Sequence, residues 1–125
     1  MNEARIQRNI EAYVAAWNEH DAAQRMRLLE RACTDDVRVR TSGQRIDGRA
    51  RLDALISDFQ ARRPRERAVF TSAIDVQGHL FRFTGVVEGG TTTRGGESFD
   101  AGECAEDGRI RVLLTFVGAA LPSRG

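Results

Sequence analysis

The sequence predicts an α+β domain in which three N-terminal helices pack on a curved, mostly antiparallel sheet. Apolar residues recur at helical spacing in the first half of the chain and alternate at strand spacing in the second half. The dipeptide Asp107-Gly108, a strong hairpin signal, separates the last two strand-like runs. Helices segregated from antiparallel strands are typical of this class. Residues 1–125 are expected to form one domain, with 119–125 as a flexible tail.

The helices are predicted from apolar stripes and their flanking residues. The first covers residues 4–19, where one face carries Ile6, Ile10, Tyr13, Val14 and Trp17. Asp21 is a candidate N-cap for a second helix over 22–32. A third is predicted over 49–62, and Pro64 ends it because the residue before a proline disfavours the helical conformation.

The strands are predicted from alternating side chains. A short strand covers residues 37–40 and precedes a loop at 41–44, before the third helix. A four-strand antiparallel meander follows, with strands at 68–73 and 76–87, a loop at 88–96, and the two arms of a final hairpin. The second of these strands is long and carries a possible interruption near Gln77-Gly78. Asp107-Gly108 predicts a type I′ turn in the hairpin.

Composition excludes several classes of function. The net charge is +1, so no global field recruits nucleic acid or an anionic membrane. The chain has no lysine and therefore no Schiff-base lysine. No metal-binding spacing of histidine and cysteine and no nucleotide-binding glycine loop is found, so neither a metal nor another cofactor is expected. With no signal-like or membrane-spanning apolar run, and with Cys33 and Cys104 expected as reduced thiols, the predicted location is the cytoplasm.

Asp100 is the main candidate for chemistry. Strand alternation places Asp100, Gly102 and Cys104 on one face, which is either packed by a bulky neighbour or open as a pocket wall. A carboxyl in an apolar pocket has a raised pKa and can act as an acid or hydrogen-bond donor. The alternative is an exposed carboxylate, or one paired with an arginine of a neighbouring strand: Arg82, Arg109 or Arg111.

Two further side chains are candidates for catalysis, and each has a plainer interpretation. Tyr13 could direct its hydroxyl into a pocket, or be a core residue with its hydroxyl at the rim. His79 could act as a general base near neutral pH, or be a solvated residue at the start of a strand. The expected pocket lining is aromatic or small and comprises Trp17, Phe59, Phe81, Phe83, Gly102 and Cys104.

Four stretches give the chain a resemblance to the SnoaL-like, ketosteroid-isomerase-like branch of the nuclear transport factor 2-like superfamily. They are residues 13–21 (Tyr-Val-Ala-Ala-Trp-Asn-Glu-His-Asp), 34–37 (Thr-Asp-Asp-Val), 47–49 (Asp-Gly-Arg) and 107–110 (Asp-Gly-Arg-Ile). The resemblance implies a cone-shaped α+β barrel with an apolar pocket at its mouth. It also implies a homodimer formed through the outer face of the sheet.

The resemblance carries over to few site residues. Asp100 matches the acidic residue that, in members that isomerise steroids, donates a hydrogen bond to a developing oxyanion, and Tyr13 matches their helical tyrosine. Their general base, an aspartate on the first short strand, has no counterpart at residues 40–42. The Arg-x-Asp arrangement of limonene-epoxide-hydrolase-like members is also missing, because Ser98 stands two positions before Asp100.

Two functional hypotheses follow. The first is a small-molecule-binding domain with an apolar pocket, acting as a cofactor-independent isomerase, cyclase or hydrolase that uses Asp100 as acid or hydrogen-bond donor. The alternative is a non-catalytic homodimerising or ligand-carrier domain whose cavity is filled by side chains. Its interface would then use outward-facing apolar residues of the sheet: Leu80, Val86, Val112 and Leu114.

Overall fold

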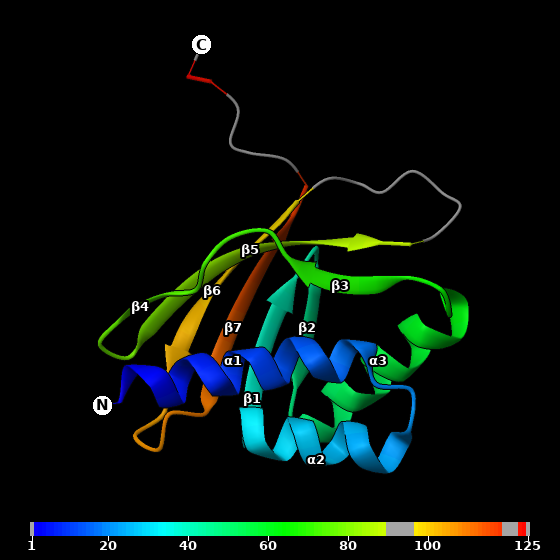
Figure 1. Ribbon diagram of the computed structural model, residues 1–125, viewed down its shortest axis with the longest axis horizontal. Helices are drawn as coiled ribbons and strands as arrows, with labels where there is room; N and C mark the ends of the chain where they lie inside the picture. The colour runs from blue at the N-terminus through cyan, green and yellow to red at the C-terminus, as the bar shows by residue number, and fades with distance from the viewer. Residues whose placement is uncertain (1, 90–96, 119–122, 125) are drawn as a thin grey trace.

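The computed structural model describes residues 2–89, 97–118, 123 and 124. In this part of the chain, three helices lie on one side of a curved sheet (Figure 1). In chain order the elements are α1 (Glu3–Asn18), α2 (Ala22–Ala32), β1 (Cys33–Thr41), β2 (Gln44–Asp47), α3 (Arg49–Arg62), β3 (Arg67–Phe70), β4 (Asp75–Gln77), β5 (Leu80–Glu88), β6 (Ser98–Cys104) and β7 (Ile110–Val117). The predicted α+β class is confirmed. Most of the predicted loop at 88–96 and of the predicted tail lies outside the described residues.

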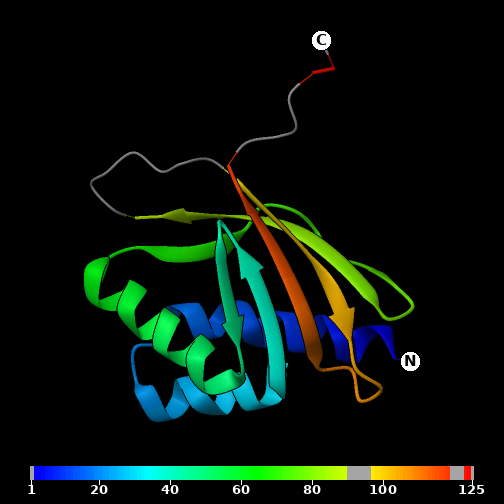
Figure 2. The ribbon, with the colours of Figure 1, turned by 180° about the vertical axis from the view of Figure 1, so that it is seen from behind.

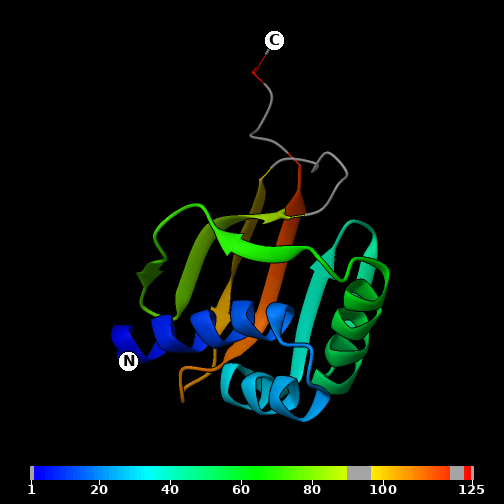
Figure 3. The ribbon, with the colours of Figure 1, turned by 45° about the vertical axis from the view of Figure 1, so that its right-hand side comes forward.

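The sheet is mixed and mostly antiparallel. Its strand order is β2-β1-β7-β6-β5-β3, with β4 paired to β5. The predicted meander corresponds to β3, β5, β6 and β7, which pair antiparallel in that order. β1 adds parallel to β7, which extends the sheet over the helices. Figures 2 and 3 show how the sheet bends away from flatness and leaves all three helices on its inner side.

Two tight turns divide the strands in the region of the predicted sheet. The interruption expected near Gln77-Gly78 is confirmed: the chain turns at Gly78, where φ is +62°, so the predicted strand 76–87 becomes β4 and β5, which pair as a hairpin. The predicted loop 41–44 is instead a tight turn at Ser42-Gly43, after which β2 starts at Gln44 and pairs with β1. Both turn residues have positive φ, +32° and +81°, as a type I′ turn requires.

The final hairpin is confirmed, but its predicted type I′ turn is wrong. Gly108 has φ of +86°, whereas Asp107 is not among the described residues with positive φ. The amide of Gly108 donates to the carbonyl of Ala105 at 2.9 Å, and that of Ala105 donates to the carbonyl of Arg109 at 2.8 Å. The connection is therefore a three-residue loop that closes on one left-handed glycine, a common alternative to the two-residue turn.

The core lies between the helices and the inner face of the sheet. Its fully buried side chains come from all three helices and from β1 and β7: Ile6, Ile10, Leu29, Leu52, Ile56, Val37, Cys33, Ile110 and Leu113. Asn18, at the end of α1, accepts from the amide of Ala68 at 2.7 Å and donates to its carbonyl at 2.9 Å. This pair of bonds fixes the end of the first helix to the edge strand β3.

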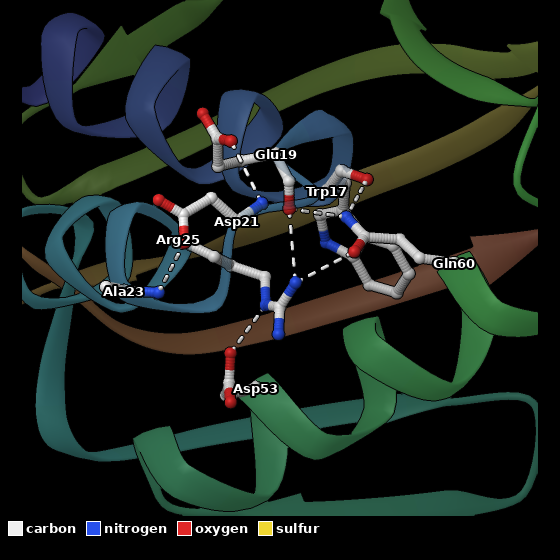
Figure 4. A network of polar contacts seen from close by, with 7 residues as sticks. All are labelled: Trp17, Glu19, Asp21, Ala23, Arg25, Asp53 and Gln60. Carbon is white, nitrogen blue, oxygen red and sulfur yellow. Dashed lines mark hydrogen bonds and ion pairs between the residues drawn. The ribbon is translucent and has the colours of Figure 1, made fainter.

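A buried arginine joins the ends of the three helices (Figure 4). The Nε of Arg25 donates to Asp53 at 2.6 Å, and its Nη1 donates to the Gln60 side chain at 2.8 Å and to the carbonyl of Glu19 at 3.1 Å. The Gln60 amide in turn donates to the carbonyls of Glu19 and Trp17, at 2.8 and 3.0 Å. The network satisfies the carbonyls at the end of α1, which the helix itself leaves without a partner.

Two further expectations can be compared with the structure. Cys33 and Cys104 are both buried and free, and they pair with opposite sides of Ile110 in the sheet. Two strand spacings, about 10 Å, thus separate their backbones, too far for a disulfide. Within the described ranges, none of the helices combines the length and the apolar character that crossing a membrane requires.

Candidate functional site

Asp100 lies on the inner face of β6 and is buried, with 7% of its surface exposed. In the register of the sheet it stands between Phe83 of β5 and Thr115 of β7. The Thr115 hydroxyl donates a hydrogen bond to Oδ1 of Asp100, and the Ser98 hydroxyl donates to Oδ2 at 3.4 Å. The Ser98 hydroxyl lies equally close, at 3.4 Å, to the carbonyl oxygen of Gly85, so Thr115 provides the firmer of the two contacts with the carboxyl.

The arginines that could have neutralised Asp100 are occupied elsewhere or exposed. Arg82 binds Asp75 at 2.7 Å, and Arg109 binds Asp107 at 2.8 Å. Arg111 is exposed on β7. Among the described residues, no ion pair reaches Asp100. Burial raises the pKa of Asp100, and the hydrogen bonds from its two hydroxyl donors oppose part of that rise.

Tyr13 lies close enough to Asp100 for its charge to matter. It is buried on α1, and burial raises the pKa of its hydroxyl far above the usual range, an effect that the Asp100 carboxylate increases. The neighbouring Trp17 side chain, one helical turn further on, opposes this rise. The hydroxyl therefore stays protonated at any working pH and is available as a donor. Among the other predicted catalytic residues, Tyr13 is the one whose pKa responds to the charge of Asp100.

His79 does not join this pair. It precedes β5 and its Nδ1 lies 3.2 Å from the carbonyl oxygen of Cys104, at the far end of β6. Because Phe83 pairs with Asp100, four residues of strand separate His79 from Asp100, or about 13 Å. A general base at His79 acting together with Asp100 is therefore not supported by the geometry.

Phe83, which pairs with Asp100 across the strands, belongs to a group of aromatic side chains. Phe83 stacks on Phe81 with 6.3 Å between ring centroids, and Phe70 meets Phe83 edge-on at 5.2 Å. Trp17 and Phe59 form a second edge-on pair at 5.4 Å. All of these rings except Phe70 were predicted as lining residues. Of these rings, Phe83 stands directly opposite Asp100, where an apolar neighbour makes ionisation of the carboxyl unfavourable.

Gly102 is packed rather than open. A Cβ at this position would lie 2.7 Å from Cζ of Phe81 and 2.1 Å from the carbonyl oxygen of Val112. The Phe81 ring thus occupies the space that the missing side chain leaves. Cys104, two residues further on the same face, is also buried, and burial raises the pKa of its thiol to about 11. Of the two interpretations of this face, packing applies at Gly102.

Three residues of the site were missed by sequence reasoning. Ser98 and Thr115 hold the carboxyl, and Phe70 packs on Phe83. The alternation of side chains along a strand could have placed Ser98 and Thr115 on the inner face. Ser98 is two positions from Asp100, and Thr115 is two positions from the buried Leu113. For Phe70 the sequence offers no comparable signal, since its contact depends on how β3 pairs with β5.

Two surface cavities in the described part of the chain are not lined by Asp100 or Tyr13. The larger of them, about 580 Å³, lies on the outer face of the sheet; its lining includes Leu80, Ala101 and Leu114, and also Phe81 and Gly102, two of the predicted pocket-lining residues. The smaller, about 360 Å³, lies between α1, α2 and the β6–β7 connection and is lined by polar side chains.

Solved structures with the same architecture are known, although no protein-family model and no curated protein sequence matches this chain. A candidate isomerase of the SnoaL-like family from Agrobacterium tumefaciens superposes with a TM-score of 0.82 at 22% identity, over 93% of this chain and 99% of that one. This chain therefore has the same fold as these SnoaL-like structures.

Two further structures agree with this assignment of the fold. A candidate SnoaL-like polyketide cyclase from Jannaschia superposes with a TM-score of 0.68 at 17% identity, over 87% of this chain and 84% of that one. An LEH-like epoxide hydrolase from M. tuberculosis gives 0.67 at 20% identity, over 91% and 83%. Identities this low establish a common SnoaL-like fold, and the site itself must support any function.

Proposed function

We propose that this SnoaL-like chain binds a small, largely apolar molecule whose oxygen atom meets Asp100 and Tyr13. One observation carries the proposal: a buried carboxyl held by two hydroxyl groups, without an ion pair among the described residues, beside a buried tyrosine hydroxyl. A carboxyl that serves only the fold is seldom buried without a cationic partner, because burying an unpaired charge costs free energy. Such groups cluster at functional sites.

The proposed chemistry is acid catalysis without a cofactor. A carboxyl with a raised pKa can give its proton to a ligand oxygen, and the Tyr13 hydroxyl supplies a second hydrogen bond to the same oxygen. Reactions that develop negative charge on oxygen fit this arrangement: isomerisation through an enol, cyclisation onto a carbonyl, or hydration of an epoxide. The fold-mates described as an isomerase, a cyclase and an epoxide hydrolase support a role of this class.

Trp17 makes the proposal testable by fluorescence, because it is the only tryptophan in the chain and lies one helical turn from Tyr13 on α1. Hydrophobic ketones and epoxides are titrated into the wild type, Asp100→Ala, Asp100→Asn and Tyr13→Phe. We expect Asp100→Ala to weaken binding about tenfold or more, the equivalent of one lost hydrogen bond to a buried group. Asp100→Asn keeps a donor but has no transferable proton, so it should bind and fail to turn over.

The exposed Asp58→Asn on α3 is the matched control and should bind as the wild type does. Quenching of Trp17 that is equal in the wild type and Asp100→Ala would refute a polar contact at Asp100. Turnover by Asp100→Asn at the wild-type rate would refute the role of Asp100 as an acid. The proposal that the ligand binds at Asp100 would still stand.

A homodimer formed through the outer face of the sheet is the second proposal, and exposed apolar side chains favour it. Leu80 is 58% exposed, Phe116 66% and Val117 65%, and Phe99 and Leu114 are also exposed. The outer-face cavity includes two of these residues in its lining. Such a patch is typical of a protein interface. Sedimentation velocity should show a dimer for the wild type and a monomer for Leu80→Arg; a wild-type monomer at micromolar concentration would refute the interface.

We further propose that the protein works in a reducing compartment such as the cytoplasm, since its two buried cysteines are free. A fluorescent fusion found outside the cytoplasm would contradict this location.

A further inference from the structure

The connection between β6 and β7 lies beside the start of α1 and the end of α2 (Figures 1 and 3). The smaller surface cavity is lined by residues of these three segments, at the other end of β6 from Asp100. It is lined by four arginines, one aspartate and one asparagine: Arg5, Arg8, Arg31, Arg109, Asp107 and Asn9. The lining therefore carries a net charge of +3 in a chain whose total is +1. We propose that this arginine cleft, defined by these six residues, binds a phosphate group.

Three of the arginines form no ion pair in the described part of the chain, although the charge of one of them, Arg5, acts on Asp107 across the cleft. Arg5, Arg8 and Arg31 are exposed and make no side-chain hydrogen bond or ion pair there. Some exposed arginines elsewhere on the surface are paired, such as Arg62 with Asp58 at 3.0 Å and Arg82 with Asp75 at 2.7 Å, and others, such as Arg51, have no described partner; the cleft differs from both in gathering several such arginines around one cavity. Like charges gathered without partners repel one another, so an anion placed among them gains from all of them.

The fourth arginine is held in position by the fold. Nε of Arg109 donates to Asp107 at 2.8 Å, and its Nη1 donates to the carbonyls of Glu30 and Cys33 at 3.3 and 3.4 Å. Within the described ranges, these hydrogen bonds use Nε and Nη1 of Arg109 and none uses its Nη2. A cation fixed in this way loses little conformational freedom when it binds a ligand.

The wall of the cleft is fixed as well. Asn9 is buried and its amide donates to the carbonyl of Gly108 at 2.8 Å, which ties the β6–β7 connection to α1. The stem of Arg5 lies over Gly108: a Cβ there would be 3.4 Å from its Cδ. Contacts with Arg109 and the charge of Arg5 hold the pKa of Asp107 below its usual range, so its carboxylate stays ionised and keeps Arg109 in place.

Phosphate is the ligand chemistry that suits the arginine cleft best. Guanidinium groups donate pairs of parallel hydrogen bonds that match phosphate oxygens. A phosphate dianion would neutralise most of the +3 charge of the lining. A volume of about 360 Å³ is in the range of small-molecule sites, so a phosphorylated small molecule fits. The lining contains no aromatic residue on which bases could stack, which argues against a single-stranded nucleic acid.

The test uses amide NMR titrations of the whole chain. Inorganic phosphate and glycerol 3-phosphate are the probes, and sodium chloride at matched ionic strength is the control. We expect saturable shifts at Arg8, Gly108 and Arg109 with both phosphates. Tighter binding of the ester would identify a phosphorylated metabolite as the source, and equal affinity would identify the free anion.

The double variant Arg8→Gln/Arg31→Gln should weaken phosphate binding about tenfold or more, the loss of roughly one charge-assisted hydrogen bond. Both side chains lack described contacts, so its thermal unfolding should match the wild type. Arg51→Gln, an exposed arginine on α3 without a described partner, is the matched control and should bind normally. An equal loss in Arg51→Gln, equal shifts with chloride, or an RNA oligomer that binds more tightly than the ester would overturn the proposal.

Discussion

The hydroxyl of Thr115 is predicted to stabilise the ionised form of Asp100, and Thr115→Val removes that hydroxyl while keeping the side-chain shape. Both partners lie on the inner face of the sheet, and Asp100 is only 7% exposed. A hydrogen bond to a charged group contributes about 1.5–3 kcal/mol, against about 0.5–1.5 kcal/mol for a neutral one. The substitution should therefore cost more at pH 7.5 than at a pH where Asp100 is protonated.

The sign of the pH dependence follows from burial. Because the pKa of Asp100 is raised, the folded state keeps a proton that the unfolded chain has released, from the ordinary aspartate value of about 3.9 up to the folded-state pKa. Stability contributed by Asp100 is thus present at low pH and falls as the pH rises through that window. Thr115→Val enlarges the fall, since it removes a donor to the charged form.

Urea denaturation between pH 4 and pH 8 measures this effect. The free energy of unfolding of Thr115→Val should lie about 1.5–3 kcal/mol below the wild type at pH 7.5 and about 1 kcal/mol closer to it at pH 4. The same substitution in the Asp100→Asn background should lose its pH dependence. A cost that is the same at both pH values, or unchanged in that background, would refute the bond to an ionised carboxylate.

Three further predictions concern other parts of the structure. Asp100→Asn, which cannot ionise, should gain stability relative to the wild type as the pH rises from 4 to 8, measured by urea denaturation; a flat difference contradicts a buried, raised-pKa carboxyl. Gly102→Ala should lower stability by about 1–3 kcal/mol, because its Cβ would overlap a backbone carbonyl at 2.1 Å; an unchanged urea midpoint excludes that packing. Asp53→Ala should cost about 3 kcal/mol by leaving Arg25 buried without its carboxylate, whereas Asp58→Ala, in an exposed pair on the same helix, should cost below about 1 kcal/mol; similar thermal shifts in the two variants would show that the network contributes little.

Periodicity predicted most of the fold because burial on one side leaves a regular trace in the sequence. The stripe on α1 that contains Ile6, Ile10 and Tyr13 is buried, as its spacing indicated. The alternation that placed Asp100, Gly102 and Cys104 on one face of β6 agrees with the burial of Asp100 and Cys104. Such patterns depend only on local geometry, so they can be identified before any tertiary contact is known.

Contacts between distant segments could not be predicted in the same way. The parallel pairing of β1 with β7 joins residues about 75 positions apart, such as Val39 and Leu113, and no local pattern specifies it. The type I′ turn formed at Ser42-Gly43 rather than at Asp107-Gly108, because Asn9 and Arg5 from α1 hold the second connection in a longer loop. The buried Arg25 also looks like any surface arginine until three helix ends meet around it.

The position of the proton on Asp100 follows from its two hydroxyl partners. A carboxylate offers about four lone-pair sites, and Thr115 and Ser98 use one on each oxygen. The Ser98 bond, at 3.4 Å, lies beyond the usual 2.5–3.0 Å range for hydroxyl–oxygen pairs and is the weaker restraint on Oδ2. Oδ1 is therefore the oxygen that the fold holds, and Oδ2 is the one free to carry a proton. Limonene-epoxide-hydrolase-like members have an arginine two positions before the acid, and this chain has Ser98 there. Asp100 therefore lacks a cation at that position to favour its charged form. A carboxyl in this environment suits a proton donor better than a permanent base.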